Sequence, residues 1–158
     1  MTNNDIIKRL RYTFDYNDSK MMSLFKAAEH DVTRAEFLAW MKKDDEAGYE
    51  EMPDLHLAAF LNGLINEKRG KKEGPQPKPE KKLNNNIILR KLRIALNLKD
   101  HDILEILELA GRTISKHELS AFFRNPEQTQ YRPLQDQILR NFLLGLQKRF
   151  RLGQRFQK

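Results

Sequence analysis

The chain matches itself when it is shifted by 82 positions, and this internal repeat restricts its fold more than any other feature. Residues 3–69 align with residues 85–151 without a gap, and 17 of the 67 aligned positions are identical. Most other apolar positions are conservative exchanges, such as Trp40 for Phe122. An ungapped match of this length indicates duplication of one module. The fold must therefore contain two similar units in tandem.

Each copy contains four segments in which apolar residues recur with the period of a helix, and no segment alternates as a strand does. The 39% of hydrophobic residues is enough for a core in a chain of 158 residues. The sequence therefore predicts an all-α protein of two tandem, pseudo-equivalent four-helix modules. In the first copy the four apolar stripes contain Ile6, Ile7, Leu10 and Phe14; Met21, Met22, Leu24, Phe25 and Ala28; Phe37, Leu38, Trp40 and Met41; and Leu57, Phe60, Leu61, Leu64 and Ile65.

The expected domain boundaries follow from the repeat. Residues 1–69 form copy one, residues 70–83 a linker rich in Pro and Lys, residues 84–152 copy two, and residues 153–158 a basic tail. Three of the six prolines lie at alternate positions of the linker. Because proline excludes helix and interior strand, we expect a flexible or extended, solvated spacer.

Most polar residues that both copies share have a structural explanation. Thr33 with Glu36, and Ser115 with Glu118, have the spacing of capping boxes. Arg11 and Arg93 flank the apolar stripe of the first helix, where an arginine usually pairs with a nearby carboxylate. Further pairs are expected to cap the first, second and fourth helices of each copy: Asn3-Asn4 and Asn85-Asn86, Asp18 and Asp100, and Asp54 and Asp136.

Gly63 and Gly145 occupy equivalent positions in the middle of the fourth predicted helix of each copy. Glycine there costs about 1 kcal/mol relative to alanine. A helix tolerates that cost where another backbone approaches closely, so both glycines predict helix crossings.

Several kinds of chemistry have no residues to support them. The chain has no cysteine, which excludes disulfides, thiolate catalysis and Cys-based zinc sites. None of the four histidines is duplicated, and no two have the spacing of a metal-binding helical pair. No glycine-rich phosphate loop or nucleophile motif is present. We therefore expect a protein that is not an enzyme, with no catalytic residues, metal or cofactor.

The net charge of +7 is unevenly distributed. Residues 1–69 carry −3, residues 70–83 carry +3, residues 84–146 carry +2 and residues 147–158 carry +5. Projected as a straight helix, the C-terminal residues place a basic ridge opposite the apolar stripe and beside the basic linker. Such a ridge could follow a phosphate backbone, although an ordinary solvated helix face would show the same pattern. The candidate nucleic-acid-binding residues are Arg140, Lys148, Arg151, Arg155, Lys71, Lys72, Lys81 and Lys82.

The repeat resembles the YehS-like proteins, a family of small, uncharacterised bacterial cytoplasmic proteins. Residues 3–11, 33–36, 85–93 and 115–118 carry the resemblance. It implies two copies of one helical domain of unknown function and a cytoplasmic location, but no activity and no site residues.

Three functions remain open from the sequence. The leading hypothesis is a non-enzymatic binding or adaptor protein whose partner is nucleic acid or a nucleoprotein. The second is a protein–protein interaction module with a groove between the repeats, and the third is an enzyme with an asymmetric site between the modules. No membrane partner is expected, because the apolar runs are too short to span a bilayer.

Overall fold

The computed structural model describes residues 1–152, and this part of the chain contains eight α-helices, one π-helical turn and no strand. The all-α prediction is confirmed, and each α-helix of the second copy begins 82 residues after its counterpart. The first copy contains α1 (Asn3–Phe14), α2 (Asp18–Ala27), α3 (Arg34–Met41) and α4 (Asp54–Arg69). The second contains α5 (Asn85–Ala95), α6 (Asp100–Leu109), α7 (Lys116–Phe122) and α8 (Asp136–Leu146), which continues into the π-helical η1 (Gln147–Leu152).

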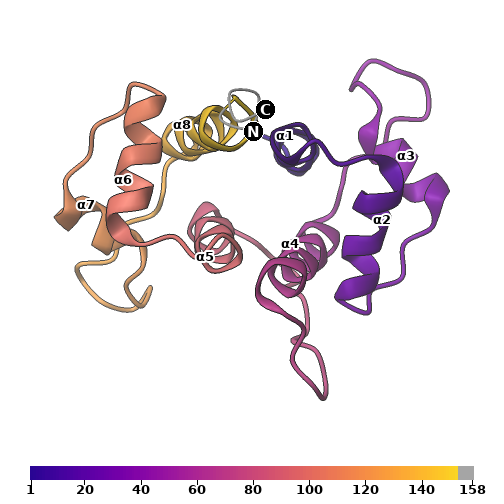
Figure 1. Ribbon diagram of the computed structural model, residues 1–158, viewed down its shortest axis with the longest axis horizontal. Helices are drawn as coiled ribbons and strands as arrows, with labels where there is room; N and C mark the ends of the chain where they lie inside the picture. Colours follow the sequence, from indigo (N-terminus) through magenta and orange to yellow (C-terminus); the bar gives the residue numbers. More distant parts are fainter. Residues whose placement is uncertain (153–158) are drawn as a thin grey trace.

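The first and fourth helices of both copies form the centre of the molecule (Figure 1). Helix α4 of copy one packs on α5 of copy two, and α1 packs on α8 and η1. The shorter pairs α2–α3 and α6–α7 lie on opposite sides of this central group (Figure 1). Buried side chains from both copies form one continuous hydrophobic core. The two modules are therefore packed together rather than separated by a spacer.

The close crossings predicted at Gly63 and Gly145 are confirmed. A Cβ atom added to Gly63 would lie 1.7 Å from the carbonyl oxygen of Leu24, and one added to Gly145 would lie 2.0 Å from that of Ile106. Leu24 and Ile106 are themselves equivalent residues of α2 and α6. In each module the fourth helix therefore touches the backbone of the second helix directly.

The duplicated asparagines hold loops and do not cap helices, contrary to the prediction. The N-caps of α1 and α5 are Thr2 and Asn84. Asn4 is buried, donates to the carbonyls of Trp40 (3.1 Å) and Glu50 (2.9 Å), and accepts from the amide of Met52 (2.9 Å). Asn86 makes the same three bonds at equivalent residues: Phe122 (3.1 Å), Arg132 (2.9 Å) and Leu134 (2.9 Å). A buried side-chain amide can meet the backbone groups of an irregular loop in this way.

The predicted capping boxes and arginine–aspartate pairs are present, whereas the N-caps of the second and fourth helices differ from the prediction. Thr33 and Ser115 are N-caps with complete capping boxes, as predicted. Arg11 pairs with Asp18 at 2.6 Å, and its counterpart Arg93 pairs with Asp100 at 2.8 Å. The four duplicated aspartates begin the second and fourth helices, where a carboxylate stabilises the positive end of the helix dipole as predicted. They are not the N-caps, which are Asn17, Pro53, Lys99 and Gln135.

The segment between the copies forms a loop that is attached to the body, and it is not the extended spacer that was expected (Figure 1). Asn66 of α4 donates to Gln76 at 2.9 Å, and Glu80 forms an ion pair with Lys91 of α5 at 3.0 Å. The amide of Leu83 donates to Asp54 at 2.8 Å. These contacts join the connection to both copies.

The glycine crossings give a stability prediction. Gly63→Ala and Gly145→Ala should each lower the free energy of unfolding by about 3 kcal/mol, because the new methyl group overlaps a backbone carbonyl that cannot rotate away. Urea unfolding followed by circular dichroism measures this. Ser23→Ala, on the exposed side of α2, serves as the control and should change stability little. Wild-type unfolding midpoints in both glycine variants would contradict the crossings.

Candidate binding groove between the repeats

The two repeats meet at two places that duplication relates, and these places differ. At one, α4 of copy one runs beside α5 of copy two; at the other, α8 of copy two runs beside α1 of copy one (Figure 1). Shifting by 82 residues converts one pair of helices into the other. Differences between them therefore show where the chain has departed from its own symmetry.

The α4–α5 contact is closed. Ala58 and Ala59 of α4 are buried there, and their small side chains allow the helices to approach. Asn62 is also buried and accepts from Lys91 at 2.6 Å. Lys91 also pairs with Glu80, so its charge is compensated within the contact.

The α1–α8 contact is open. Arg140 and Asn141 stand at the positions of the two alanines, with Arg140 exposed and Asn141 half-buried. These larger polar side chains line a cavity of about 460 Å³, which we call the α1–α8 groove. Its lining is Met1, Asp5, Lys8, Arg9, Tyr12, Gln137, Arg140, Asn141, Leu144 and Gln147.

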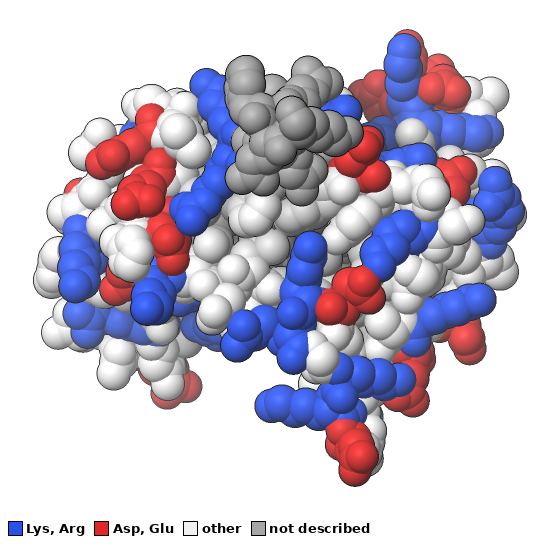
Figure 2. All heavy atoms as spheres, viewed as in Figure 1, with Lys and Arg blue, Asp and Glu red and all other residues white. Residues whose placement is uncertain are grey.

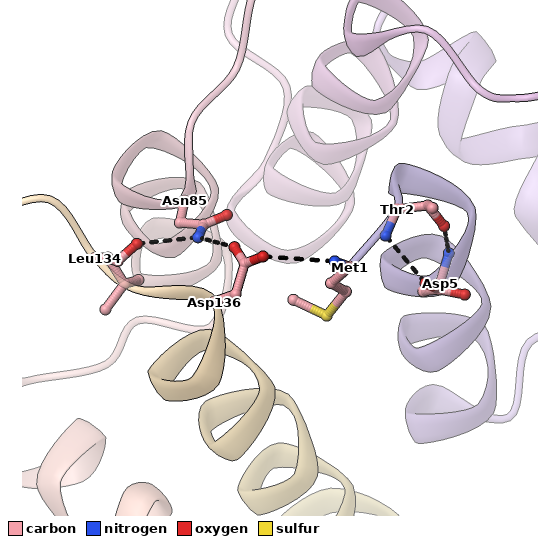
Figure 3. Close-up of polar contacts among 6 residues, drawn as sticks. All are labelled: Met1, Thr2, Asp5, Asn85, Leu134 and Asp136. Atoms are coloured by element: carbon pink, nitrogen blue, oxygen red, sulfur yellow. Dashed lines mark hydrogen bonds and ion pairs between the residues drawn. The ribbon is translucent and has the colours of Figure 1, made fainter.

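Polar contacts between the copies close the groove at its first end. The amino nitrogen of Met1 lies 3.5 Å from Asp136, which also accepts from Asn85 at 2.6 Å (Figure 3). The equivalent contact at the other interface joins the amide of Leu83 to Asp54. The pseudo-symmetry of the two interfaces thus extends to individual hydrogen bonds.

The second end is closed by η1. The ring of Phe150 lies 5.6 Å from that of Phe14, between centroids. The guanidinium of Arg151 lies 3.9 Å from the ring centroid of Tyr12, donates to the Tyr12 carbonyl at 2.7 Å and pairs with Asp15 at 3.3 Å. The π-helical turn thus binds α1 and fixes the separation of α1 and α8.

The charge of the groove is predominantly positive. Its side-chain cations are Lys8, Arg9 and Arg140, and no carboxylate within residues 1–152 forms an ion pair with any of them, whereas the amino group of Met1 pairs with Asp136. Arg9 donates to Gln147 across the groove at 3.5 Å. The Lys8 ammonium donates to the carbonyl of Lys42.

The carboxylates near the groove, Asp5 and Asp136, accept hydrogen bonds from neighbouring residues at the ends of helices. Burial alone would raise the pKa of Asp5, but hydrogen bonds from Thr2 outweigh burial and lower the pKa below its ordinary value (Figure 3). The hydrogen bond from Asn85 lowers the pKa of Asp136, and the amino group of Met1 adds to that effect. Both groups therefore remain ionised within contacts that hold the ends of helices.

The predicted C-terminal ridge is only partly present. Arg140 lies in the groove, and Lys148 is exposed with its ammonium 3.2 Å from the Leu109 carbonyl. Arg151 does not face away from the protein as predicted, since its side chain is 18% exposed and packs on α1. The straight-helix projection is wrong here because the chain changes from α- to π-helical hydrogen bonding at Gln147, which alters the direction of each later side chain. Arg155 lies outside the described residues.

The linker lysines lie away from the groove. The loop that carries them projects at the opposite edge of the molecule from α1 and α8 (Figure 1). Lys71 pairs with Glu29 at 2.9 Å, whereas Lys72, Lys81 and Lys82 are exposed. Figure 2 shows several basic side chains around this loop, with acidic side chains among them, and further basic side chains elsewhere on the same face. The structure therefore does not bring the ridge and linker candidates into one surface.

The sequence predictions missed Lys8, Arg9 and Tyr12, which lie in the first helix and reach the groove from copy one. The positive charge of Lys8 and Arg9 did not by itself indicate a groove, since the equivalent residues of copy two, Arg90 and Lys91, are also basic. The sequence feature that could have indicated the groove is the replacement of Ala58 and Ala59 of copy one by Arg140 and Asn141 in copy two.

A pair of histidines meets in the first module only. Nε2 of His30 and Nδ1 of His56 are 2.9 Å apart, and the His56 ring also lies 4.8 Å from that of Trp40. Burial lowers the pKa of His56, and His30 lowers it further, while Glu36 acts in the opposite direction. No cluster of three or more potential metal ligands occurs within residues 1–152.

The lowered pKa of His56 leads to a prediction about how the stability of the protein depends on pH. With its pKa lowered on folding, His56 binds fewer protons in the folded chain than in the unfolded chain, so stability should decrease as the pH falls below the unfolded value of about 6.5. His56→Ile, which introduces the residue found at position 138, should reduce the loss of stability between pH 7.5 and 5.5. Urea unfolding at both pH values measures it, with His117→Ala as the exposed control. The same pH dependence in His56→Ile and wild type would contradict the assignment.

The geometry defines a duplicated helical protein with one closed and one open contact between its copies. Residues 3–70 and 85–151 each match the family described as "Protein of unknown function (DUF1456)". The chain belongs to this family, as its resemblance to the YehS-like proteins indicated.

A curated relative is similar along almost the entire chain. The "Uncharacterized protein YehS" of Escherichia coli (strain K12) is 42% identical over 150 residues, which cover 94% of this chain and 96% of that protein. No solved structure matches the chain. Within residues 1–152 no helix is both long and apolar enough to cross a membrane.

Proposed function

We propose that this protein is a non-enzymatic binding protein of the cytoplasm that holds nucleic acid, free or within a nucleoprotein, in the α1–α8 groove. The observation that carries the proposal is the pair of arginines, Arg9 of copy one and Arg140 of copy two, on one concave surface. Lys8 also lines this surface, but its ammonium is held by the carbonyl of Lys42. The equivalent α4–α5 contact is closed by alanines and has its lysine compensated. Positive charge and open volume thus occur together at only one of the two related contacts.

The chemistry of the lining supports a phosphate backbone as the ligand. Arginine donates two parallel hydrogen bonds to phosphate oxygens. The side-chain amides of Gln137, Asn141 and Gln147 line the same surface. Such polar groups commonly contact phosphate and sugar.

An exposed aromatic ring favours a single strand over a duplex. Tyr12 is 46% exposed at the edge of the groove. The guanidinium of Arg151 covers one face of this ring, so a base would stack on the other face. Unpaired bases stack on such rings, whereas bases within a duplex are not available for stacking. The lining also favours this proposal over a protein–protein module that uses the same groove, because six of its ten residues are cations or amides.

The test is a titration of the full chain with fluorescent single-stranded RNA and DNA and with duplex DNA, at several salt concentrations. In Arg9→Gln/Arg140→Gln we expect binding of the single strands to weaken by tenfold or more. The logarithmic salt slope should fall by about 1.4, because each phosphate contact on a single strand contributes about 0.7.

The matched control is Lys26→Gln/Lys116→Gln. It removes the same charge from two exposed lysines of α2 and α7, outside the groove, and should leave the slope near that of wild type. Absence of wild-type binding near 0.15 M salt, or equal slopes in the groove variant and its control, would refute the proposal.

A further inference from the structure

The second module contains a pocket at a place that is filled in the first. The place lies where the loop after the second helix, the third helix and the start of the fourth helix meet. In copy one it is occupied by His30, Trp40 and His56, and the equivalent residues of copy two are Arg112, Phe122 and Ile138. The duplication therefore supplies a filled and an unfilled version of one site in a single chain.

In copy one, aromatic rings pack against one another at this place. The ring centroids of His30 and His56 are 5.0 Å apart, and those of His56 and Trp40 are 4.8 Å apart. The hydrogen bond between the two histidines fixes this arrangement.

In copy two, Phe122 replaces the larger Trp40, Ile138 replaces His56, and a cavity of about 510 Å³ is present, which we call the copy-two pocket. Its volume is in the range of sites that hold small molecules. Phe122 and Ile138 also line a narrow apolar cavity that extends among the core residues of this module. The pocket is lined by Arg112, Glu118, Phe122, Arg132, Pro133, Gln135 and Ile138.

Two guanidinium groups give the pocket its polarity. Nη1 of Arg132 donates to the carbonyls of Thr129 (2.8 Å) and Tyr131 (2.9 Å), so the loop holds this side chain in place. In the described part of the chain, neither Arg112 nor Arg132 forms an ion pair with a carboxylate. The acidic residue of the lining, Glu118, accepts from the amide of Ser115 at 3.1 Å within its capping box.

We propose that the copy-two pocket binds a small organic anion: a carboxylate, sulfonate or phosphate group carried by a flat apolar body. The anionic group would lie between Arg112 and Arg132, and the apolar body would cover Phe122, Ile138 and Pro133. Apolar walls with a few convergent polar groups are the usual composition of a small-molecule site. This site is separate from the α1–α8 groove, with which it shares no lining residue.

The probe is 8-anilinonaphthalene-1-sulfonate, an aromatic sulfonate of the stated class, titrated into the full chain and followed by fluorescence. Its position is read from the methyl spectrum of isoleucine-labelled protein, where the Ile138 signal should shift on binding. Arg112→Gln should weaken binding about tenfold, since a charge-assisted hydrogen bond is lost.

A second variant rebuilds the filled site of copy one within copy two. Arg112→His, Phe122→Trp and Ile138→His together should abolish the probe-dependent fluorescence of the folded protein. The reciprocal variant His30→Arg, Trp40→Phe, His56→Ile and Glu50→Arg, which also places an arginine at the position equivalent to Arg132, should create an additional probe site in copy one. Native-like spectra are required of each variant, and Arg112→Gln remains the test if the triple variant does not fold.

The result that overturns the proposal is a probe that leaves the Ile138 methyl signal unchanged, or one whose affinity is the same in Arg112→Gln and wild type. Nucleic-acid binding through the α1–α8 groove should be unaffected by Arg112→Gln, so the two proposals can fail independently.

Discussion

The direct contact between the backbones of the second and fourth helices is the constraint on which the rest of each module depends. Gly63 and Gly145 allow it because any side chain would overlap the carbonyl of Leu24 or Ile106. With these helices fixed, the buried amide of Asn4 or Asn86 holds the loop between the third and fourth helices. Both features occur twice at an offset of 82 residues, so both modules are built by the same interactions.

The functional interest lies in the places where this symmetry fails. The alanine pair that closes the α4–α5 contact becomes Arg140 and Asn141 at the α1–α8 contact, which opens into a positively charged groove. In the outer part of each module, the histidine pair of copy one gives way to Arg112 and Ile138 beside a pocket. Duplicated scaffold residues preserve the fold, while unduplicated residues alter the surface of one copy. Each departure places arginine next to open volume.

The sequence was sufficient for the helices, the capping boxes and the glycine crossings, because each depends on local spacing or on an exact internal match. It was not sufficient for the tertiary roles of Asn4 and Asn86, whose partners lie 36 to 48 residues away. The straight-helix projection failed at Arg151 because the π-helical turn interrupts the helical period. A groove between the repeats was one of the alternatives, but its position and its lining were not predicted, since they require the relative placement of α1 and α8. The replacement of two alanines by Arg140 and Asn141 was the sequence feature that corresponds to the groove.

The most direct measurement of the central claim, that the two related contacts differ in function, is amide chemical-shift mapping of the full chain with a short single-stranded RNA. We expect the largest changes at residues 8–12 of α1 and 137–147 of α8 and η1, and small changes at the equivalent residues 90–94 and 55–65. Changes centred on linker residues 71–82, or equal changes at both contacts, would contradict the account.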